Sequence, residues 1–286
     1  MKGIVLAGGT GSRLRPLTSV ISKHLLPIYD KPLIFYPIST LMLAGVRVIT
    51  VVVTPEHESM YRTAIGDGSR WGIVINYQVQ REPGGLPQAI ALATEQDRAT
   101  SHLVVLGDNI FHGVGLGQSL NHLSGLEGAV AFAHEVQNPQ DYGVIELNQD
   151  SEILSIEEKP SHPKSNLVVP GLYYFDSNAS EYVSELKASH RGELEIVDLL
   201  KRYWRNGSLK VEKLQRGTAW FDAGSPEALF GASEYVKVLQ ERQGGLLGSP
   251  DEVAWRLGLI NQSELQRIAE LNLNSSYGRS LLRMLS

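Results

Sequence analysis

Three short apolar runs of one kind recur in the first 107 residues, and a helix-like stretch lies between each pair. The runs are 2–7 (KGIVLA), 47–53 (RVITVVV) and 102–107 (HLVVLG), and the helical stretches are 33–44 and 86–96. Strands that alternate with helices predict βαβ units and a parallel sheet. Because these strands are apolar throughout, we expect the sheet to be covered on both faces. The predicted fold class is α/β, with a mainly parallel central sheet flanked by helices.

Beyond residue 126 the pattern changes to strands that follow one another directly. The segments AVAFAHEV, GVIELN, EILSIEE and LVVPGLYYF leave little room for helices, which predicts antiparallel or mixed pairing. Helices are expected again at 177–187 and 195–205, and 226–286 is mostly helical in pattern. We therefore predict an α/β domain over 1–242 and a small helical C-terminal region over 243–286.

Composition excludes several classes of site. The 286 residues include no cysteine, which removes disulfides, thiolate zinc sites and cysteine nucleophiles. The net charge is −5 and the basic residues are scattered singly, so we expect a small anion rather than a nucleic acid as partner. No apolar stretch approaches the ~20 residues that span a bilayer, and residues 1–7 lack a signal-peptide pattern. These features predict a cytoplasmic protein without membrane contact.

A glycine-rich turn follows the first strand in GIVLAGGTGSRLRP, residues 3–16. Such a turn lies at the carboxyl edge of a parallel sheet, where its backbone N–H groups can approach phosphate oxygens. The P-loop motif is excluded because the chain contains no Gly-Lys pair, and the dinucleotide motif G-x-G-x-x-G fails at Leu14. On residue types alone, a tight turn with solvated arginines remains an alternative.

The longer stretch LAGGTGSRLRPLT, followed by SKHLLPIYDKPLI, resembles the signature of sugar-1-phosphate nucleotidyltransferases, in particular of members that make dTDP-glucose. The resemblance runs nearly from end to end. It implies the nucleotide-diphospho-sugar transferase fold and a Mg²⁺-dependent transfer of the thymidylyl group of dTTP to glucose 1-phosphate, with pyrophosphate released. This reaction opens dTDP-deoxysugar synthesis, for example that of dTDP-rhamnose. Use of UTP, or a non-catalytic nucleotide-sugar sensor on the same fold, are the alternatives.

The resemblance also implies roles for residues at the nucleotide. Arg13 would bind the departing pyrophosphate, and Lys23 would add a second cation. Gln80, in YQVQREPGGLPQAI, would bond the pyrimidine edge, although Pro87 stands where the family usually has alanine. Proline is accepted in a first helical turn, so we expect binding to survive. The implied nucleotide-binding residues are Leu6, Gly8, Gly9, Gly11, Ser12, Gln80, Gly85 and Asp108.

At the sugar phosphate, the resemblance implies Lys159 and Arg191 as further catalytic cations, and Glu193 near the sugar. The implied sugar-phosphate residues are Asn109, Tyr142, Gly143, Glu158, Lys159, Val169, Gly171 and Tyr174. Asp108, in VVLGDNIF, and Asp222, in AWFDAGSPEAL, match the family's metal ligands. Two carboxylates suit Mg²⁺, which takes few protein ligands and keeps waters and phosphates.

The C-terminal segments EVAWRLGLI and YGRSLLRML match the long form of these enzymes. That match implies a homotetramer and a second, regulatory site for the nucleotide or dTDP-rhamnose. A plain helical cap on the core is the alternative. The segment 111–120 (FHGVGLGQSL) has glycines where bulkier polar residues are common in the family, so feedback inhibition is expected to differ if it lines that site.

Overall fold

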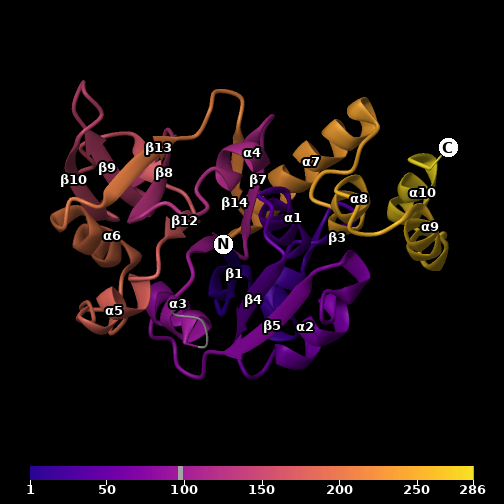
Figure 1. The fold of residues 1–286 in the computed structure, drawn as a ribbon, viewed down its shortest axis with the longest axis horizontal. Coiled ribbons are helices and arrows are strands. Elements are labelled where there is room, and N and C mark those ends of the chain that lie inside the picture. The colour runs from indigo at the N-terminus through magenta and orange to yellow at the C-terminus, as the bar shows by residue number, and fades with distance from the viewer. Residues whose placement is uncertain (96–98, 286) are drawn as a thin grey trace.

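A mixed sheet forms the centre of the molecule (Figure 1). The computed structural model describes residues 1–95 and 99–285. Within these residues the sheet has ten strands, in the order β10-β9-β11-β8-β12-β6-β1-β4-β5, with β13 beside β8. Its parallel strands are β1 (Lys2–Ala7), β4 (Val48–Val53), β5 (Val74–Val79) and β6 (His102–Leu106).

The second half of the sheet is mostly antiparallel, as the sequence predicts. Strand β13 is the exception, since it runs parallel to β8. The strands of this half are β8 (Ala129–Glu135), β9 (Gly143–Leu147), β10 (Ile153–Glu158), β11 (Leu167–Val169), β12 (Leu172–Phe175) and β13 (Leu209–Lys213). Strand β12 joins the two halves, because it pairs antiparallel with both β6 and β8. The predicted fold class is confirmed.

Helices cover both faces of the sheet, which explains why the inner parallel strands β1, β4 and β6 are largely apolar, whereas the edge strand β5 is not. Alternate residues of β1 enter two separate cores: Val5 lies in one, and Ile4 and Leu6 lie in the other. The helices are α1 (Phe35–Leu43), α2 (Glu58–Ile65), α3 (Leu86–Thr94), α4 (Leu116–Asn121), α5 (Ala179–Ser184), α6 (Ile196–Arg205), α7 (Pro226–Gln243), α8 (Pro250–Arg256), α9 (Gln262–Leu271) and α10 (Ser276–Arg283). Among the described helices, none is both long and apolar enough to cross a membrane.

Most predicted elements are present with their ends shifted by one or two residues. The helix expected over 33–44 spans Phe35–Leu43, and the one expected over 86–96 spans Leu86–Thr94, with position 96 outside the described residues. The short strands β7 (Asn109–His112) and β14 (Ala219–Asp222), which pair with each other, were not predicted. They prove to be important, because Asp222 ends β14 and Asp108 directly precedes β7, so their pairing brings the candidate metal ligands together.

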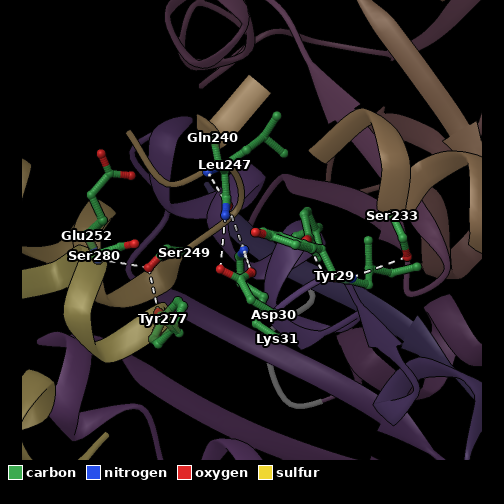
Figure 2. A network of polar contacts seen from close by, with 12 residues as sticks. Tyr29, Asp30, Lys31, Ser233, Gln240, Leu247, Ser249, Glu252, Tyr277 and Ser280 are labelled. Atoms are coloured by element: carbon green, nitrogen blue, oxygen red, sulfur yellow. Dashed lines mark hydrogen bonds and ion pairs between the residues drawn. The ribbon is translucent and has the colours of Figure 1, made fainter. Parts of the chain in front are cut away.

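A buried polar network fixes the C-terminal helices to the first part of the chain (Figure 2). A small hairpin, β2 (Pro27–Ile28) and β3 (Lys31–Pro32), presents Asp30 and Lys31. The Lys31 Nζ donates to Oδ1 of Asp30 at 2.5 Å and to Oε1 of Gln240, on α7, at 2.9 Å. The Gln240 amide donates in turn to Oδ2 of Asp30 at 2.9 Å. The side chains of the ion pair are only 1% and 4% exposed.

Aromatic rings and a second hydrogen-bonded group enclose this ion pair. The Lys31 Nζ lies 5.1 Å from the ring centre of Tyr36 and 5.7 Å from that of Tyr277, on α10. The Tyr277 hydroxyl is 2.6 Å from Oγ of Ser249 and donates to Asp251, which also accepts from Nε1 of Trp71 at 2.7 Å. Residues from α8 to α10 also enter the same apolar core as α1. The C-terminal helices are thus held to the sheet by both polar and apolar contacts.

We predict that Lys31→Met lowers the free energy of unfolding by about 3–5 kcal/mol, because it leaves the buried Asp30 carboxylate without its cation. Urea denaturation of the purified variant measures the change. Lys164→Met is the matched control: it breaks an exposed pair with Glu157 and should leave stability essentially unchanged. Equal stability of Lys31→Met and the parent would contradict the role given to the ion pair.

Candidate active site

The glycine-rich loop leaves the carboxyl end of β1, and its first two glycines lie against the ends of two polar side chains. A Cβ on Gly8 would lie 2.8 Å from Oε1 of Gln80, and one on Gly9 would lie 3.1 Å from Cε of Lys23. Gly11 adopts φ +61°, a left-handed conformation that favours glycine. The loop therefore holds its backbone bare between two polar side chains from other segments.

Asp108 and Asp222 meet at the same edge of the sheet. Asp108 lies between β6 and β7, and β14 pairs antiparallel with β7 so that Asp222 lies opposite Asn109. The backbone N–H of Ala223 donates to the carbonyl of Asp108 at 2.9 Å. Two carboxylates that are 114 residues apart in the sequence are thereby brought together by one long-range antiparallel strand pair.

The two carboxylates have opposite electrostatic environments. Burial opposes ionisation of Asp108, but the ammonium of Lys23, which forms an ion pair with it, and the amide of Asn109 outweigh burial and lower its pKa to about 2. Burial and then the charge of Asp108 raise the pKa of Asp222 to about 6.

Cations from three separate segments act on Asp222 and lower its pKa against those two effects: Lys23, Arg13 and Lys159. A Cβ on Gly224 would lie 2.6 Å from Nη2 of Arg13 and 3.1 Å from Oδ1 of Asp222. Both side chains therefore lie against Gly224, which places the Arg13 guanidinium beside the Asp222 carboxylate.

Asn109 is held in one orientation by its neighbours. Its Oδ1 accepts from the N–H of Gly171 at 3.1 Å and from Nε1 of Trp220 at 2.6 Å, so its NH₂ group is directed to Oδ1 of Asp108 at 2.9 Å. Trp220 also contacts Tyr142 edge to face, with ring centres 5.1 Å apart. Sequence reasoning considered only Asp222 in this segment and missed Trp220.

The expected sugar-phosphate residues cluster at the neighbouring strands. Gly143 pairs with Glu158 across β9 and β10 and with Val169 across β9 and β11. Lys159 adopts φ +44°, an uncommon conformation for a lysine, and its N–H donates to the carbonyl of Tyr142 at 3.0 Å.

Several charged side chains lie close together on this side of the site. Burial, and then Glu195, raise the pKa of Glu158. The Arg191 guanidinium is exposed, at 2.7 Å from Oε2 of Glu195 and 3.6 Å from Oε1 of Glu158. Arg191 therefore stands at the open side of this cluster.

A cavity of about 290 Å³ lies between the glycine loop and α3. Nε2 of Gln80 donates to the carbonyl of Gly85 at 3.2 Å and to Oε1 of Gln88 at 2.7 Å, and Gln88 was not singled out from the sequence. Pro87 lies in the first turn of α3. The lining residues are Leu6, Gly8, Gly9, Thr10, Lys23, His24, Gln80, Pro83, Gly85, Leu86, Ala89, Leu106, Asp108 and Glu193.

Tyr174 does not lie with the other expected sugar-phosphate residues. Its side chain is fully buried in the α1 side of the core, and its hydroxyl donates to the carbonyl of Leu126 at 2.7 Å. Side chains alternate along a strand, so the neighbouring Tyr173 faces the other core, where the charge of Glu158 adds to burial in raising its pKa. Ser12 and Arg13 are exposed on the 3₁₀ turn η1 (Ser12–Leu14).

His24 is a further residue at the site that sequence reasoning missed. It lines the cavity yet is almost fully buried. Burial, then the charge of Lys23, lower its pKa to about 3, so the imidazole is neutral in the folded chain. No local pattern marked it, because a histidine beside a lysine in a turn is unremarkable in sequence.

A family model described as "Nucleotidyl transferase" matches residues 2–238. The chain is a nucleotidyl transferase. Curated relatives of this nucleotidyl transferase named glucose-1-phosphate thymidylyltransferase include those of Mycolicibacterium smegmatis and Neisseria meningitidis serogroup A. Each is 46% identical, over 100% of this chain and 99% of the relative.

Solved structures resemble this nucleotidyl transferase as well. A Bacillus anthracis chain described as a candidate glucose-1-phosphate thymidylyltransferase, in complex with sucrose, has a TM-score of 0.76 and 37% identity, covering 82% of this chain and 94% of that one. A UDP-glucose pyrophosphorylase complexed with UDP-glucose has a TM-score of 0.73 and 25% identity, covering 84% and 99%.

We predict that the free energy of unfolding decreases as the pH falls from 6.5 towards 4. The unfolded chain protonates His24 near pH 6.5, whereas the folded chain resists until about pH 3, and His102, whose pKa burial lowers to about 4, acts in the same direction. Asp222, whose pKa is raised to about 6, opposes them below pH 6, but it is one group against two. Each such histidine adds up to about 1.4 kcal/mol per pH unit within its window. Urea titrations from pH 7 to 4.5 measure the slope.

His24→Gln should flatten this slope, and His24→Gln combined with His102→Gln should flatten it further. An unchanged slope in both variants would show that other groups cause the pH dependence.

Proposed function

We propose that this protein transfers the thymidylyl group of dTTP to α-D-glucose 1-phosphate, giving dTDP-glucose and pyrophosphate. The observation that carries the proposal is the convergence of Arg13, Lys23 and Lys159 on the Asp108–Asp222 pair. This cluster adjoins the cavity beneath the bare glycine loop. The names and 46% identity of full-length relatives support this pair of substrates.

The donor groups of the site fit Mg²⁺. Asp108 and Asp222 are close enough for one charge to raise the pKa of the other, and both offer the hard oxygens that this ion prefers. Within residues 1–95 and 99–285, no group of three or more His, Cys, Asp or Glu competes as a metal site. We propose that the two aspartates hold Mg²⁺ together with phosphate oxygens, where it would neutralise charge at the α-phosphate.

The residues of the chain then have to bring two polyanions together. The attacking oxygen of glucose 1-phosphate is already anionic at neutral pH, so no general base is required. Lys159, with Arg191 at the open side, orients the sugar phosphate in line with the α-phosphorus of dTTP. Arg13 and Lys23 stabilise the charge that develops on the leaving pyrophosphate.

Gln80 and the strands β9–β11 supply the recognition of base and sugar. The NH₂ group of Gln80 donates to Gln88 and to Gly85, which leaves its Oε1 available to accept a hydrogen bond from the N–H at the edge of thymine. The Glu158 carboxylate can accept hydrogen bonds from sugar hydroxyl groups. UTP remains the alternative nucleotide, because the thymine methyl group is worth only about 1–3 kcal/mol in a pocket.

We propose further that the C-terminal helices make the contacts of a homotetramer and border a second, regulatory site. A cavity of about 530 Å³ supports this proposal, because it lies between α1, α7 and α8 and is lined by Gly113, Gly115 and Gly117 of the glycine-rich segment. Because these glycines offer no side chains to a ligand, we expect dTDP-rhamnose to inhibit the enzyme differently from other members of the family. Titration of dTDP-rhamnose into the activity assay measures this inhibition. Ordinary inhibition would contradict that expectation.

We predict pyrophosphate release when the protein is mixed with Mg²⁺, glucose 1-phosphate and dTTP, and its loss on addition of EDTA, because the phosphates then lose their counter-charge. Parallel reactions with UTP, ATP, CTP and GTP rank the nucleotides. Faster release with UTP would favour the uridylyl reaction. Binding of dTTP without release in any reaction would favour a sensor.

We predict that Arg13→Ala lowers kcat by about 10²–10³-fold while the fold survives, because one preorganised charge at the leaving group is removed. Arg15→Ala is the matched control, since both arginines are exposed on the same turn and only Arg13 lies beside Asp222. Circular dichroism checks the fold. Normal turnover in folded Arg13→Ala protein would remove the proposed role.

A further inference from the structure

A buried polar cluster lies directly behind Lys23. Tyr61 comes from α2, and Ser22 and His24 flank Lys23 in the chain. The Tyr61 hydroxyl is 2.7 Å from Oγ of Ser22 and 2.8 Å from Nδ1 of His24, and these two atoms are 3.1 Å apart. The three residues are 0–3% exposed, so the hydrogen bonds among them are shielded from bulk water.

The same hydroxyl also reaches the start of the glycine loop. It donates to the carbonyl of Ala7, the last residue of β1, at 3.3 Å. Tyr61 is therefore hydrogen-bonded on one side to the strand that leads into the loop, and on the other to the residues before and after Lys23. It joins two segments that both contribute to the phosphate side of the site.

The backbone that carries Lys23 belongs to no regular strand or long helix. Lys23 opens a single 3₁₀ turn, η3 (Lys23–Leu25), which is too short to be stable by itself. Besides the bonds from Leu25 to Ser22 at 3.0 Å and from Leu26 to Lys23 at 3.2 Å, the N–H of Ile34 donates to the carbonyl of His24 at 2.8 Å. The imidazole of His24 packs so closely on Gly107 that a Cβ there would lie 2.7 Å from Cδ2.

The position of Lys23 matters because its ammonium has two tasks. In the free chain it pairs with Asp108, and its Nζ would lie only 3.2 Å from a Cβ on Gly9. Once nucleotide and metal occupy the site, the ammonium must reach the phosphates by side-chain rotation alone. This requires that its Cα stay fixed relative to the loop.

We propose that the Tyr61 hydroxyl is a positioning group for catalysis, which fixes Lys23 against the glycine loop through Ser22, His24 and the Ala7 carbonyl. The inference rests on the proposed function, because Tyr61 would act through Lys23, whose catalytic role is part of that proposal. Tyr61 touches no substrate and acts only through the lysine.

The test compares Tyr61→Phe with Tyr203→Phe. Tyr203, on the distant helix α6, is equally buried, and its hydroxyl donates to Asp176 at 2.7 Å. Tyr203→Phe therefore removes the same kind of buried hydroxyl without touching Lys23. Both variants should melt earlier than the parent. Assayed well below both melting temperatures, Tyr61→Phe should lose about 10- to 10²-fold in kcat with little change in the KM for glucose 1-phosphate, as expected of a misplaced group.

A double-mutant cycle with Lys23→Ala decides whether the lysine carries the effect. In the Lys23→Ala background, Tyr61→Phe should have little further effect on kcat. The same fold-loss in both backgrounds would overturn the proposal. A lower melting temperature with unchanged kcat would also overturn it, because Tyr61 would then be purely structural.

Failure of the proposed function can be told apart from failure of this inference. A parent protein that releases no pyrophosphate refutes the function. Calorimetric binding of dTTP with Mg²⁺ then still tests the positioning role, because Tyr61→Phe should weaken the affinity several-fold and Tyr203→Phe should not. Equal affinities in both variants would overturn it.

Discussion

The ion pair between Lys23 and Asp108 is the interaction on which the site depends. Two carboxylates buried at one edge of a sheet repel each other, and a chain can keep them there only if a cation compensates. Lys23 provides that cation before any ligand arrives, and it lowers the pKa of Asp222 against burial and the charge of Asp108, which together keep that pKa raised. Under the proposed function, arriving nucleotide and metal would take the place of Lys23 beside the two carboxylates. The cations at this site would then allow an acidic protein to bind two highly charged anions.

The topology of the sheet explains why these charges meet where they do. The parallel strands β1, β4 and β6 all end at one edge, which brings together the glycine loop and Asp108. Strand β12 then reverses the pairing direction, and β9, β10 and β11 bring Gly143, Glu158 and Val169 to the neighbouring side. The proposed nucleotide side of the site is thus built by parallel strands and the proposed sugar side by antiparallel ones.

Local patterns predicted β1, β4 and β6, because burial on both faces makes them largely apolar, but not the parallel edge strand β5, whose sequence VINYQV is partly polar. Family motifs drew attention to Lys23, Asp108 and Asp222. The sequence could not predict contacts that depend on distant segments. Trp220 bonds Asn109 across 111 residues, and Tyr61 reaches His24 from another helix. Tyr174 and Tyr173 differ only in which face of β12 they occupy, which a motif match does not decide. The roles of the site residues and the division at 242 stay predictions.

The buried Asp30–Lys31 pair also limits how this chain could be shortened. The pair is hydrogen-bonded by Gln240, and the ring of Tyr277, near the other end of the sequence, covers Lys31. The family model ends at residue 238, yet a chain cut there would retain the ion pair, lose its amide partner and open it to water. The same hairpin follows the turn that carries Lys23. Deletion or proteolytic removal of the last helices would therefore disturb the catalytic half directly, so the C-terminal segment is part of the enzyme's working unit rather than a detachable appendage.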